Sequence, residues 1–167
     1  YVSVGDTTVI SVGLQDSIAN LDDDETFGWI QTFLSENVDA GVAYDNVAGG
    51  IYDTDDHSIQ IVSDLGNGIK IGGALEALNV GADAGSAVAV LSYGSETISA
   101  HFTAVAGDIL DGTFEDLAIH TGVTATIDKF KARAALAAND TGWWNGIISG
   151  EATFDMFALA AAVDAEV

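Results

Sequence analysis

Three of the four basic residues of this chain fall within five positions, in the segment KFKAR at 129–133. In an extended strand, alternation sends Lys131 and Arg133 to the face opposite Phe130. Cations on one polar face, with carboxylates across from them, form a transverse electric field that orients dipolar solutes in a water-filled passage. Lys129 fits better a basic group that snorkels beside a turn. The chemistry that this segment suggests is therefore electrostatic selection of solutes.

The same alternation collects other ionisable side chains on the polar faces of several segments. His101 and His120, for example, oppose apolar neighbours such as Phe102 and Val123. An unpaired charge in a dry core is costly, so a lumen wet enough to solvate these groups explains them. The sequence therefore predicts a pore lined by Lys70, Glu76, His101, His120, Lys131, Arg133, Glu151 and Asp164. Lys131 and Arg133 are expected to stand across from acidic residues such as Glu76, Glu151 and the Asp-rich loops.

Two acidic strings, DDDE at 22–25 and DTDDH at 53–57, raise the question of a metal site. Carboxylate oxygens are Ca²⁺ ligands, and the weak candidates here are Asp53, Asp55 and Asp56. Neither string has the spaced ligands and the glycine of an EF-hand loop. The strings are therefore expected to be solvated loops, with Ca²⁺ that bridges to lipid headgroup phosphates as the alternative.

Motifs for catalysis are missing from the sequence. His57, His101 and His120 lie in different segments, and there is no HExxH, no GxSxG and no glycine-rich phosphate loop. The chain has no cysteine, which removes thiolate metal sites and cysteine nucleophiles. The prediction is a protein without enzymatic activity and with no cofactor other than Ca²⁺ at the acidic loops.

The composition combines strong acidity with a high apolar content. There are 26 acidic residues against 4 basic ones, a formal charge of -22, yet 49% of the residues are hydrophobic and the mean hydropathy is +0.30. Such a surface repels phosphates, so nucleic acid is excluded as a partner. The apolar content excludes a disordered chain. The sequence has no run of 18 or more uncharged apolar residues, so it predicts no membrane-spanning helix.

The elements that must position these side chains are strands, because apolar and polar residues alternate with period two. Segments of about 8 to 11 residues, the length that a tilted strand needs to cross a membrane, alternate within 38–44, 58–78, 98–104, 119–127, 130–138 and 157–163. Tight turns are predicted at Glu36-Asn37, Gly66-Asn67-Gly68, Gly94-Ser95, Asp128 and Asp155. Longer polar loops, such as GDILDGTFEDL and NDTGWWNG, are predicted between these hairpins, and most aromatic residues fall near strand ends.

Short turns at one edge and longer loops at the other are typical of a transmembrane β-barrel. The predicted fold class is all-β, an antiparallel up-and-down transmembrane β-barrel, with residues 1–167 as a single domain of about 11 strands. Apolar side chains would face lipid and polar ones the lumen, which inverts a soluble barrel. A soluble β-meander or sandwich is the alternative. A helical reading of 131–138 and 156–167 is disfavoured, because the charges leave no apolar stripe at 3.6 spacing.

The cadence of strand, tight turn, strand and loop is similar to that of one family. It is carried by SVGLQDSIANLDDDETFG, by the hairpin DHSIQIVSDLGNGIKIGGALEALN and by the tail GVTATIDKFKARAALAANDTGWWNGIISGEATFDMFALAAAVDAEV. Across residues 7–166 the chain resembles a Gram-negative general porin of the alphaproteobacterial kind. The resemblance implies a portion of a 16-stranded barrel in the cell outer membrane, a constriction loop folded inward and a homotrimer. It also implies contacts with outer-membrane lipid and lipopolysaccharide, and passage of small hydrophilic solutes and ions.

Three features differ from those of a complete member of that family. A count of about 11 strands is odd and too small for 16, and Val167 is not the terminal aromatic residue of a complete porin. The chain also begins at Tyr1, without an initiator Met or an apolar leader. From the start at Tyr1 we expect a chain that was either processed after export or cut from a longer one. From the strand count and Val167 we expect an internal portion of a longer protein.

Two hypotheses of function follow. The preferred one is a passive diffusion channel that favours cations, because its lumen and loops are acidic. The rival is a secreted, acidic β-rich binding or surface-layer protein, with Ca²⁺ at the acidic loops or haem at His57, His101 and His120 as its ligand. The rival predicts solubility without detergent, whereas the channel requires detergent.

Overall fold

The computed structural model describes residues 2–20, 56–78, 85–110 and 112–167. Within them the chain forms ten strands and one short 3-10 helix. The elements are β1 (Val2–Val4), β2 (Thr8–Gln15), η1 (Ile18–Asn20), β3 (Asp56–Gly66), β4 (Ile69–Glu76), β5 (Ser86–Gly94), β6 (Ile98–Ala106), β7 (Leu117–Ile127), β8 (Phe130–Asn139), β9 (Trp144–Phe154) and β10 (Phe157–Glu166). In these residues no helix has the length and apolar character needed to cross a membrane.

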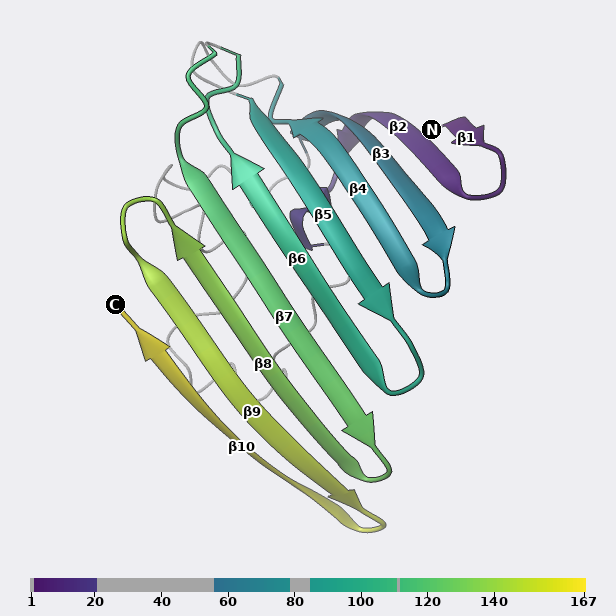
Figure 1. Ribbon diagram of the computed structural model, residues 1–167, viewed down its shortest axis with the longest axis vertical. Helices are drawn as coiled ribbons and strands as arrows, with labels where there is room; N and C mark the ends of the chain where they lie inside the picture. The colour runs from purple at the N-terminus through teal and green to yellow at the C-terminus, as the bar shows by residue number, and fades with distance from the viewer. Residues whose placement is uncertain (1, 21–55, 79–84, 111) are drawn as a thin grey trace.

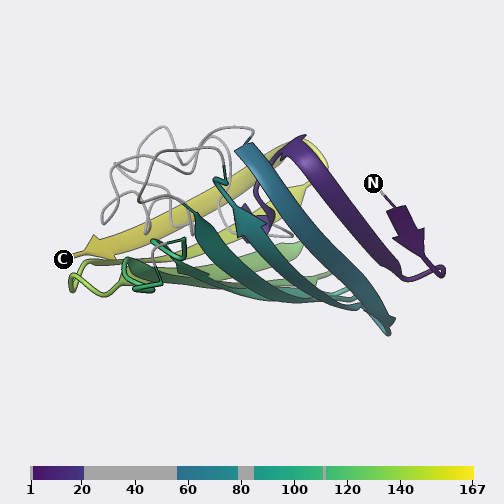
Figure 2. The same ribbon diagram turned by 90° about the horizontal axis from the view of Figure 1, so that it is seen from above.

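The strands form one sheet in the order of the sequence, and each neighbouring pair is antiparallel (Figure 1). Nine of them, β2 to β10, have 8 to 11 residues, and β1 has three. Viewed from above, the sheet curls into a trough (Figure 2). Among the described strands β1 and β10 are the two edges, so the sheet is open. The predicted all-β class and the up-and-down antiparallel order are confirmed at this level.

Four predicted tight turns join consecutive strands at one end of the sheet (Figure 1). They are Gly66-Asn67-Gly68, Gly94-Ser95, Asp128 and Asp155. Asn67 and Asp128 both have a φ of 54°, a conformation that asparagine and aspartate tolerate better than most residues. The predicted turn at Glu36-Asn37 and the predicted strand at 38–44 lie outside the described residues.

One predicted loop is shorter in the structure, and one strand lacks the alternation signal. The loop expected over NDTGWWNG is shorter, because Asn139 pairs with Ala118 and Asn145 pairs with Ala137, so that only 140–143 lie between β8 and β9. Strand β5 shows no alternation, and only the predicted tight turn at Gly94-Ser95 implied a strand before it. Both of its faces are apolar, with Val88 and Val90 inward and Leu91 outward, so the period-two signal is weak.

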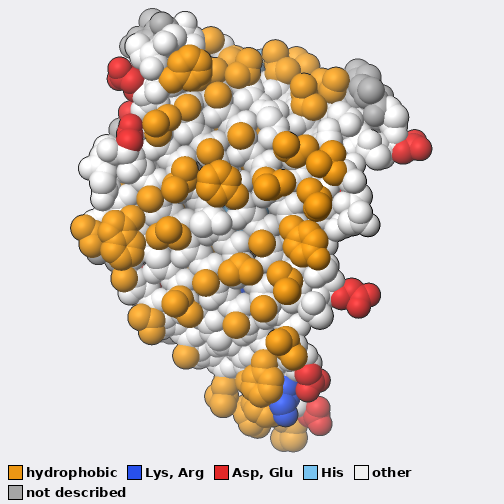
Figure 3. Space-filling model, viewed as in Figure 1, with side chains coloured by type: hydrophobic (Ala, Val, Ile, Leu, Met, Phe, Trp, Pro, Cys, Tyr) orange, Lys and Arg blue, Asp and Glu red, His pale blue; other side chains and the backbone are white. Residues whose placement is uncertain are grey.

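The convex side of the sheet is covered with exposed apolar side chains. We call it the outer face; Ile71, Phe102, Val123 and Ile148 are among its exposed residues. Figure 3 looks onto this side and shows hydrophobic side chains spread across it, with charged side chains gathered at its margins. A soluble antiparallel sheet normally buries its apolar face and exposes the polar one. This sheet does the opposite, as the alternation predicted.

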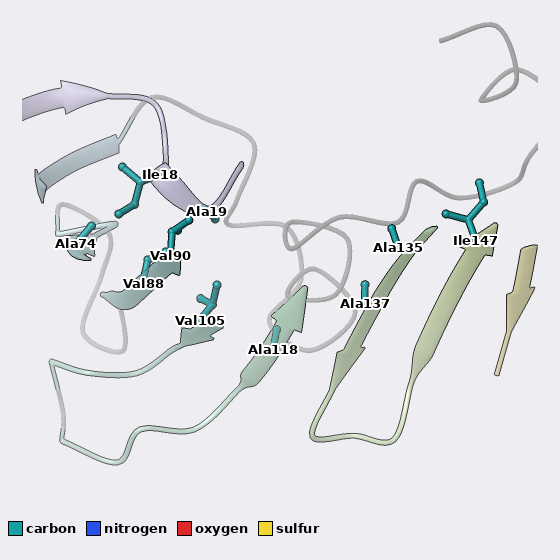
Figure 4. Close-up of a cluster of buried hydrophobic side chains, with 10 residues drawn as sticks. All are labelled: Ile18, Ala19, Ala74, Val88, Val90, Val105, Ala118, Ala135, Ala137 and Ile147. Atoms are coloured by element: carbon teal, nitrogen blue, oxygen red, sulfur yellow. The ribbon is translucent and has the colours of Figure 1, made fainter. Parts of the chain in front are cut away.

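The opposite, concave side, which we call the inner face, is not uniformly polar. Ile18 and Ala19 of η1 pack against an apolar patch on the inner faces of β4, β5 and β6, formed by Ala74, Val88, Val90 and Val105 (Figure 4). Ala118, Ala135, Ala137 and Ile147 continue the cluster of buried apolar residues along β7, β8 and β9. The expected wholly polar interior is therefore corrected: part of the inner face is a small core covered by η1.

Candidate functional site: the polar inner face

All eight residues that were predicted to line a pore share the inner face. Their strands and register partners place them as follows: Lys70 and Glu76 on β4, beside Ser92 and Ser86 of β5; His101 on β6 and His120 on β7; Lys131 and Arg133 on β8; Glu151 on β9; and Asp164 on β10, beside Ile147. Side chains alternate between the two faces of a strand, which explains why these residues share one face.

His101 and His120 form a pair that the sequence does not predict. The Nε2 atom of His101 lies 2.8 Å from the Nδ1 atom of His120, and the ring centroids are 4.5 Å apart with 38° between the planes. Both rings are buried, with 3% and 0% of their surface exposed. Only one proton fits between two nitrogens at this distance, so one ring donates and the other accepts.

The register between β6 and β7 creates this pair. His120 stands directly opposite Thr103, so His101, two residues along β6, is its diagonal neighbour on the same face. The sequence places each histidine on the polar side of its own strand. It does not reveal how far one strand is shifted along the other, because the connection over 107–116 is too long to fix the register by turn geometry.

The cations of β8 lie next to a carboxylate on the adjacent strand. Lys131 is the register partner of Glu151, and Arg133 stands between Thr124 of β7 and Ser149 of β9. Cβ atoms of such partners lie about 4.5–5.5 Å apart. The expected arrangement, with Glu151 across the passage from the cations, is therefore wrong: Glu151 is beside Lys131 in the same part of the sheet.

Glu76 is tied to η1. The backbone N–H of Ile18 donates to Glu76 Oε1 at 2.9 Å, and Gln60 Nε2 donates to the same oxygen at 3.3 Å and to the carbonyl oxygen of Asp16 at 2.6 Å. On β6, the Thr103 hydroxyl donates to the carbonyl oxygen of Ala19 at 2.9 Å. These bonds hold η1 on the inner face, so Glu76 has a structural partner as well as the predicted position.

Asn145 is a further polar residue of the inner face, and no sequence motif singles it out. It lies on β9 with none of its surface exposed, and among the described residues neither its amide nitrogen nor its amide oxygen has a hydrogen-bond partner. The Ser149 hydroxyl, four residues further along β9 on the same face, has no hydrogen-bond partner among the described residues either. Buried polar atoms are normally hydrogen-bonded, so these positions are where ordered water belongs.

The acidic and histidine metal candidates are not brought together. Asp53 and Asp55 lie outside the described residues, and Asp56 begins β3. His57, also on β3, is exposed and alternates onto the face opposite the buried Ser58 and Gln60, away from the histidine pair. In the described part of the chain no group of three or more potential ligands is placed to hold a metal ion.

An acidic cluster lies at the end of the sheet opposite the tight turns. Gly107 N–H donates to the carbonyl oxygen of Glu115 at 2.9 Å, and Asp140 N–H donates to that of Leu117 at 3.0 Å. The first bond closes the connection between β6 and β7, and the second joins the loop after β8 to the start of β7. Partial burial raises the pKa of Asp116, and the charges of Asp108 and Asp140 raise it further.

Most exposed aromatic side chains lie near strand ends, as predicted, although Phe102 lies in the middle of β6. Phe130, Phe154 and Phe157 lie at the tight-turn end, and the last two rings are 4.9 Å apart. Lys129 Nζ lies 4.9 Å from the centre of the Phe154 ring and 5.8 Å from that of Phe130. Trp144 begins β9 at the other end. Lys129 thus stands beside a turn, where the sequence placed it.

The fold and the inner face together define an open antiparallel meander sheet, apolar and exposed outside, with both polar residues and a small apolar core inside. No protein-family model, no curated protein and no solved structure matches the chain.

Proposed function

We propose that this chain is part of the wall of a passive diffusion channel in the outer membrane of a Gram-negative bacterium. Its strands would belong to a closed transmembrane barrel, 16-stranded if the resemblance to the general porins extends that far. Small hydrophilic solutes and ions would cross along the inner face, down their gradients, without a reaction or a cofactor. The observation that carries the proposal is the inverted sheet, exposed and apolar on its convex side.

The apolar outer face supports a location in which lipid contacts the sheet. Continuous apolar patches larger than a few hundred Å² are rare on soluble monomers. Here Ile59, Ile71, Phe102, Val123 and Ile148 are exposed on five different strands, β3, β4, β6, β7 and β9. In water this surface would drive association, whereas in a bilayer it is matched by acyl chains.

The length of β9 fits the apolar thickness of an outer membrane. Trp144 and Phe154 share the outer face at the two ends of the strand, ten residues apart. At about 3.3 Å per residue that span is about 33 Å along the strand, and a tilt of about 40° reduces it to about 25 Å. This equals the height of the apolar band that the aromatic girdles of outer-membrane barrels enclose.

The inner face suits a polar passage with selectivity for charge. Three of the four basic residues, Lys70, Lys131 and Arg133, alternate inward, while the 26 acidic residues give the chain its formal charge of -22. We expect cation preference, because the acidic excess concentrates cations near the openings. From the porin resemblance we also propose a homotrimer that contacts lipid and lipopolysaccharide.

Planar-bilayer recording tests the channel directly. The purified protein should give conductance steps and, in a salt gradient, a reversal potential that favours cations. The double variant Lys131→Gln, Arg133→Gln should increase cation preference, and Glu151→Gln should decrease it, because the first removes inward cations and the second an inward carboxylate. Glu96→Gln, in an exposed turn, is the control and should change neither. Anion preference would contradict the expected selectivity.

Extraction behaviour separates the channel from the rival hypothesis. The channel requires detergent to leave the membrane and should migrate as an oligomer that heat dissociates. A species that is soluble in water at 17.1 kDa would overturn the proposal and favour the secreted binding or surface-layer protein.

A further inference from the structure

The histidine pair has a geometry that can do more than share a hydrogen bond. His101 Nε2 and His120 Nδ1 face each other at 2.8 Å. Two imidazole nitrogens held at about 2.0 Å from one metal ion, at a right angle, are about 2.8 Å apart, whereas tetrahedral coordination spreads them to about 3.3 Å. The measured separation thus fits adjacent corners of a tetragonal site, the geometry that Cu²⁺ and Ni²⁺ favour with nitrogen ligands.

The orientation of the rings agrees with this. The ring centroids are 4.5 Å apart and the ring planes are tilted by 38°. If both rings lay along the straight line through Nε2 and Nδ1, their centroids would be farther apart than this. The rings are therefore bent relative to the line between the nitrogens, and a point beside that line is within reach of both lone pairs.

The positions beside the pair on the inner face carry small side chains. Gly122, the register partner of His101, has no side chain, and Ala137, the register partner of His120, has only a methyl group. Further along the same face of β8 are Ala135 and then Arg133. Glu76, on β4, is engaged by the Ile18 N–H.

We propose that His101 and His120 form a two-imidazole binding site for a divalent transition-metal ion, Cu²⁺ or Ni²⁺, on the inner face of the sheet. The proton between the rings must move when the ion binds. In the neutral pair it transfers to the other nitrogen of its own ring, and in a protonated pair it is released to solvent. Water or a solute fills the remaining coordination positions. This site does not depend on the proposed channel function.

The test uses the full chain, first stripped with a chelator and then titrated with CuCl₂ or NiCl₂ alone. We expect one ion per chain and, for Cu²⁺, an electron paramagnetic resonance spectrum of a tetragonal ion with two nitrogen ligands. Binding should weaken at acid pH, because protonated imidazole cannot coordinate. Failure to bind one ion per chain would overturn the proposal.

Variants identify the ligands. His101→Asn and His120→Asn should each weaken binding by at least the roughly 10- to 100-fold that loss of a second-shell partner costs. His57→Asn, on the opposite face, is the matched control and should leave the affinity unchanged. If the His101→Asn, His120→Asn double variant binds like the parent, or His57→Asn removes the site, the assignment is wrong.

Because His120 is fully buried, its variant could unfold the hairpin, so the unmodified chain provides an independent measurement. With Cu²⁺ as the probe, the ring resonances of His101 and His120 should broaden at low ion-to-chain ratios, because the ion is paramagnetic, while those of His57 stay sharp. Broadening confined to His57, or none at all, would contradict the proposed site.

Discussion

The backbone N–H of Ile18 donates a hydrogen bond to Glu76 Oε1 at 2.9 Å, across 58 positions of sequence. Ile18 belongs to η1 and Glu76 ends β4, so this bond attaches the 3-10 helix to the inner face of the sheet. Both residues are buried. A carboxylate of the predicted pore lining therefore has a structural role.

Replacing Glu76 should destabilise this attachment. Glu76→Ala leaves the buried Ile18 N–H without this acceptor, and we expect the free energy of unfolding to fall by about 1–3 kcal/mol. Glu76→Gln keeps a carbonyl oxygen and should cost less. Denaturant unfolding measures both, with Glu96→Ala in an exposed turn as the control. Equal effects of Glu76→Ala and Glu96→Ala would show that the bond adds nothing to stability.

Gly68 is expected to be intolerant of any side chain. Its φ is 79°, and a Cβ there would overlap the carbonyl oxygen of Gly94. Gly68→Ala should lower the free energy of unfolding by roughly 1–3 kcal/mol or more. Gly73→Ala, on the adjoining strand β4, is the control, because its Cβ would meet nothing within 4 Å and its φ is ordinary. If the two alanine variants unfold at the same denaturant concentration, the close approach is not real.

Arginine scanning of the outer face distinguishes lipid from water. Ile148 and Ile127 are each 70% exposed, but Ile148 lies near the middle of β9 and Ile127 ends β7 beside a tight turn. In a bilayer, Ile148→Arg should cost about 2–4 kcal/mol and Ile127→Arg about 0–1 kcal/mol. The measurement is unfolding from lipid vesicles. Small and equal effects at both positions would mean that the outer face meets water.

Asp116 should make stability depend on pH. Because the folded-state pKa of this carboxyl is raised, by partial burial first and by Asp108 and Asp140 next, the folded chain binds its proton more tightly than the unfolded chain. Stability from this group is therefore present below the unfolded pKa and is lost as pH rises through the folded pKa. Asp116→Asn should raise the melting temperature at neutral pH and flatten this loss.

The exposed Asp6, in the turn between β1 and β2, provides the control for that experiment. Asp6→Asn should change the melting temperature little at either pH 4 or pH 7. If the melting temperature of Asp116→Asn equals that of the parent at both pH values, the acidic cluster does not destabilise the folded chain.

Much of the fold could be predicted because it rests on local signals. The turns at Asn67 and Asp128 use residues that accept a positive φ, and the strands between them show two-residue alternation. Strand β5 shows no alternation and was implied only by the turn at Gly94-Ser95, because η1 covers its inner face and makes both faces apolar. That cover comes from residues 18–20, far from Ser86 where β5 begins, and no local pattern reports a contact over such a separation.

Alternation along each strand is enough to say which side chains share a face. Successive Cβ atoms of a strand point to opposite sides, so the residue order alone puts Lys131, Arg133, His101 and His120 together on the inner face. Which of these side chains are neighbours depends on the three-dimensional fold. The register between strands joins His101 to His120 and sets Glu151 beside Lys131. Register depends on connections and on packing between remote segments, and alternation along one strand carries no information about either.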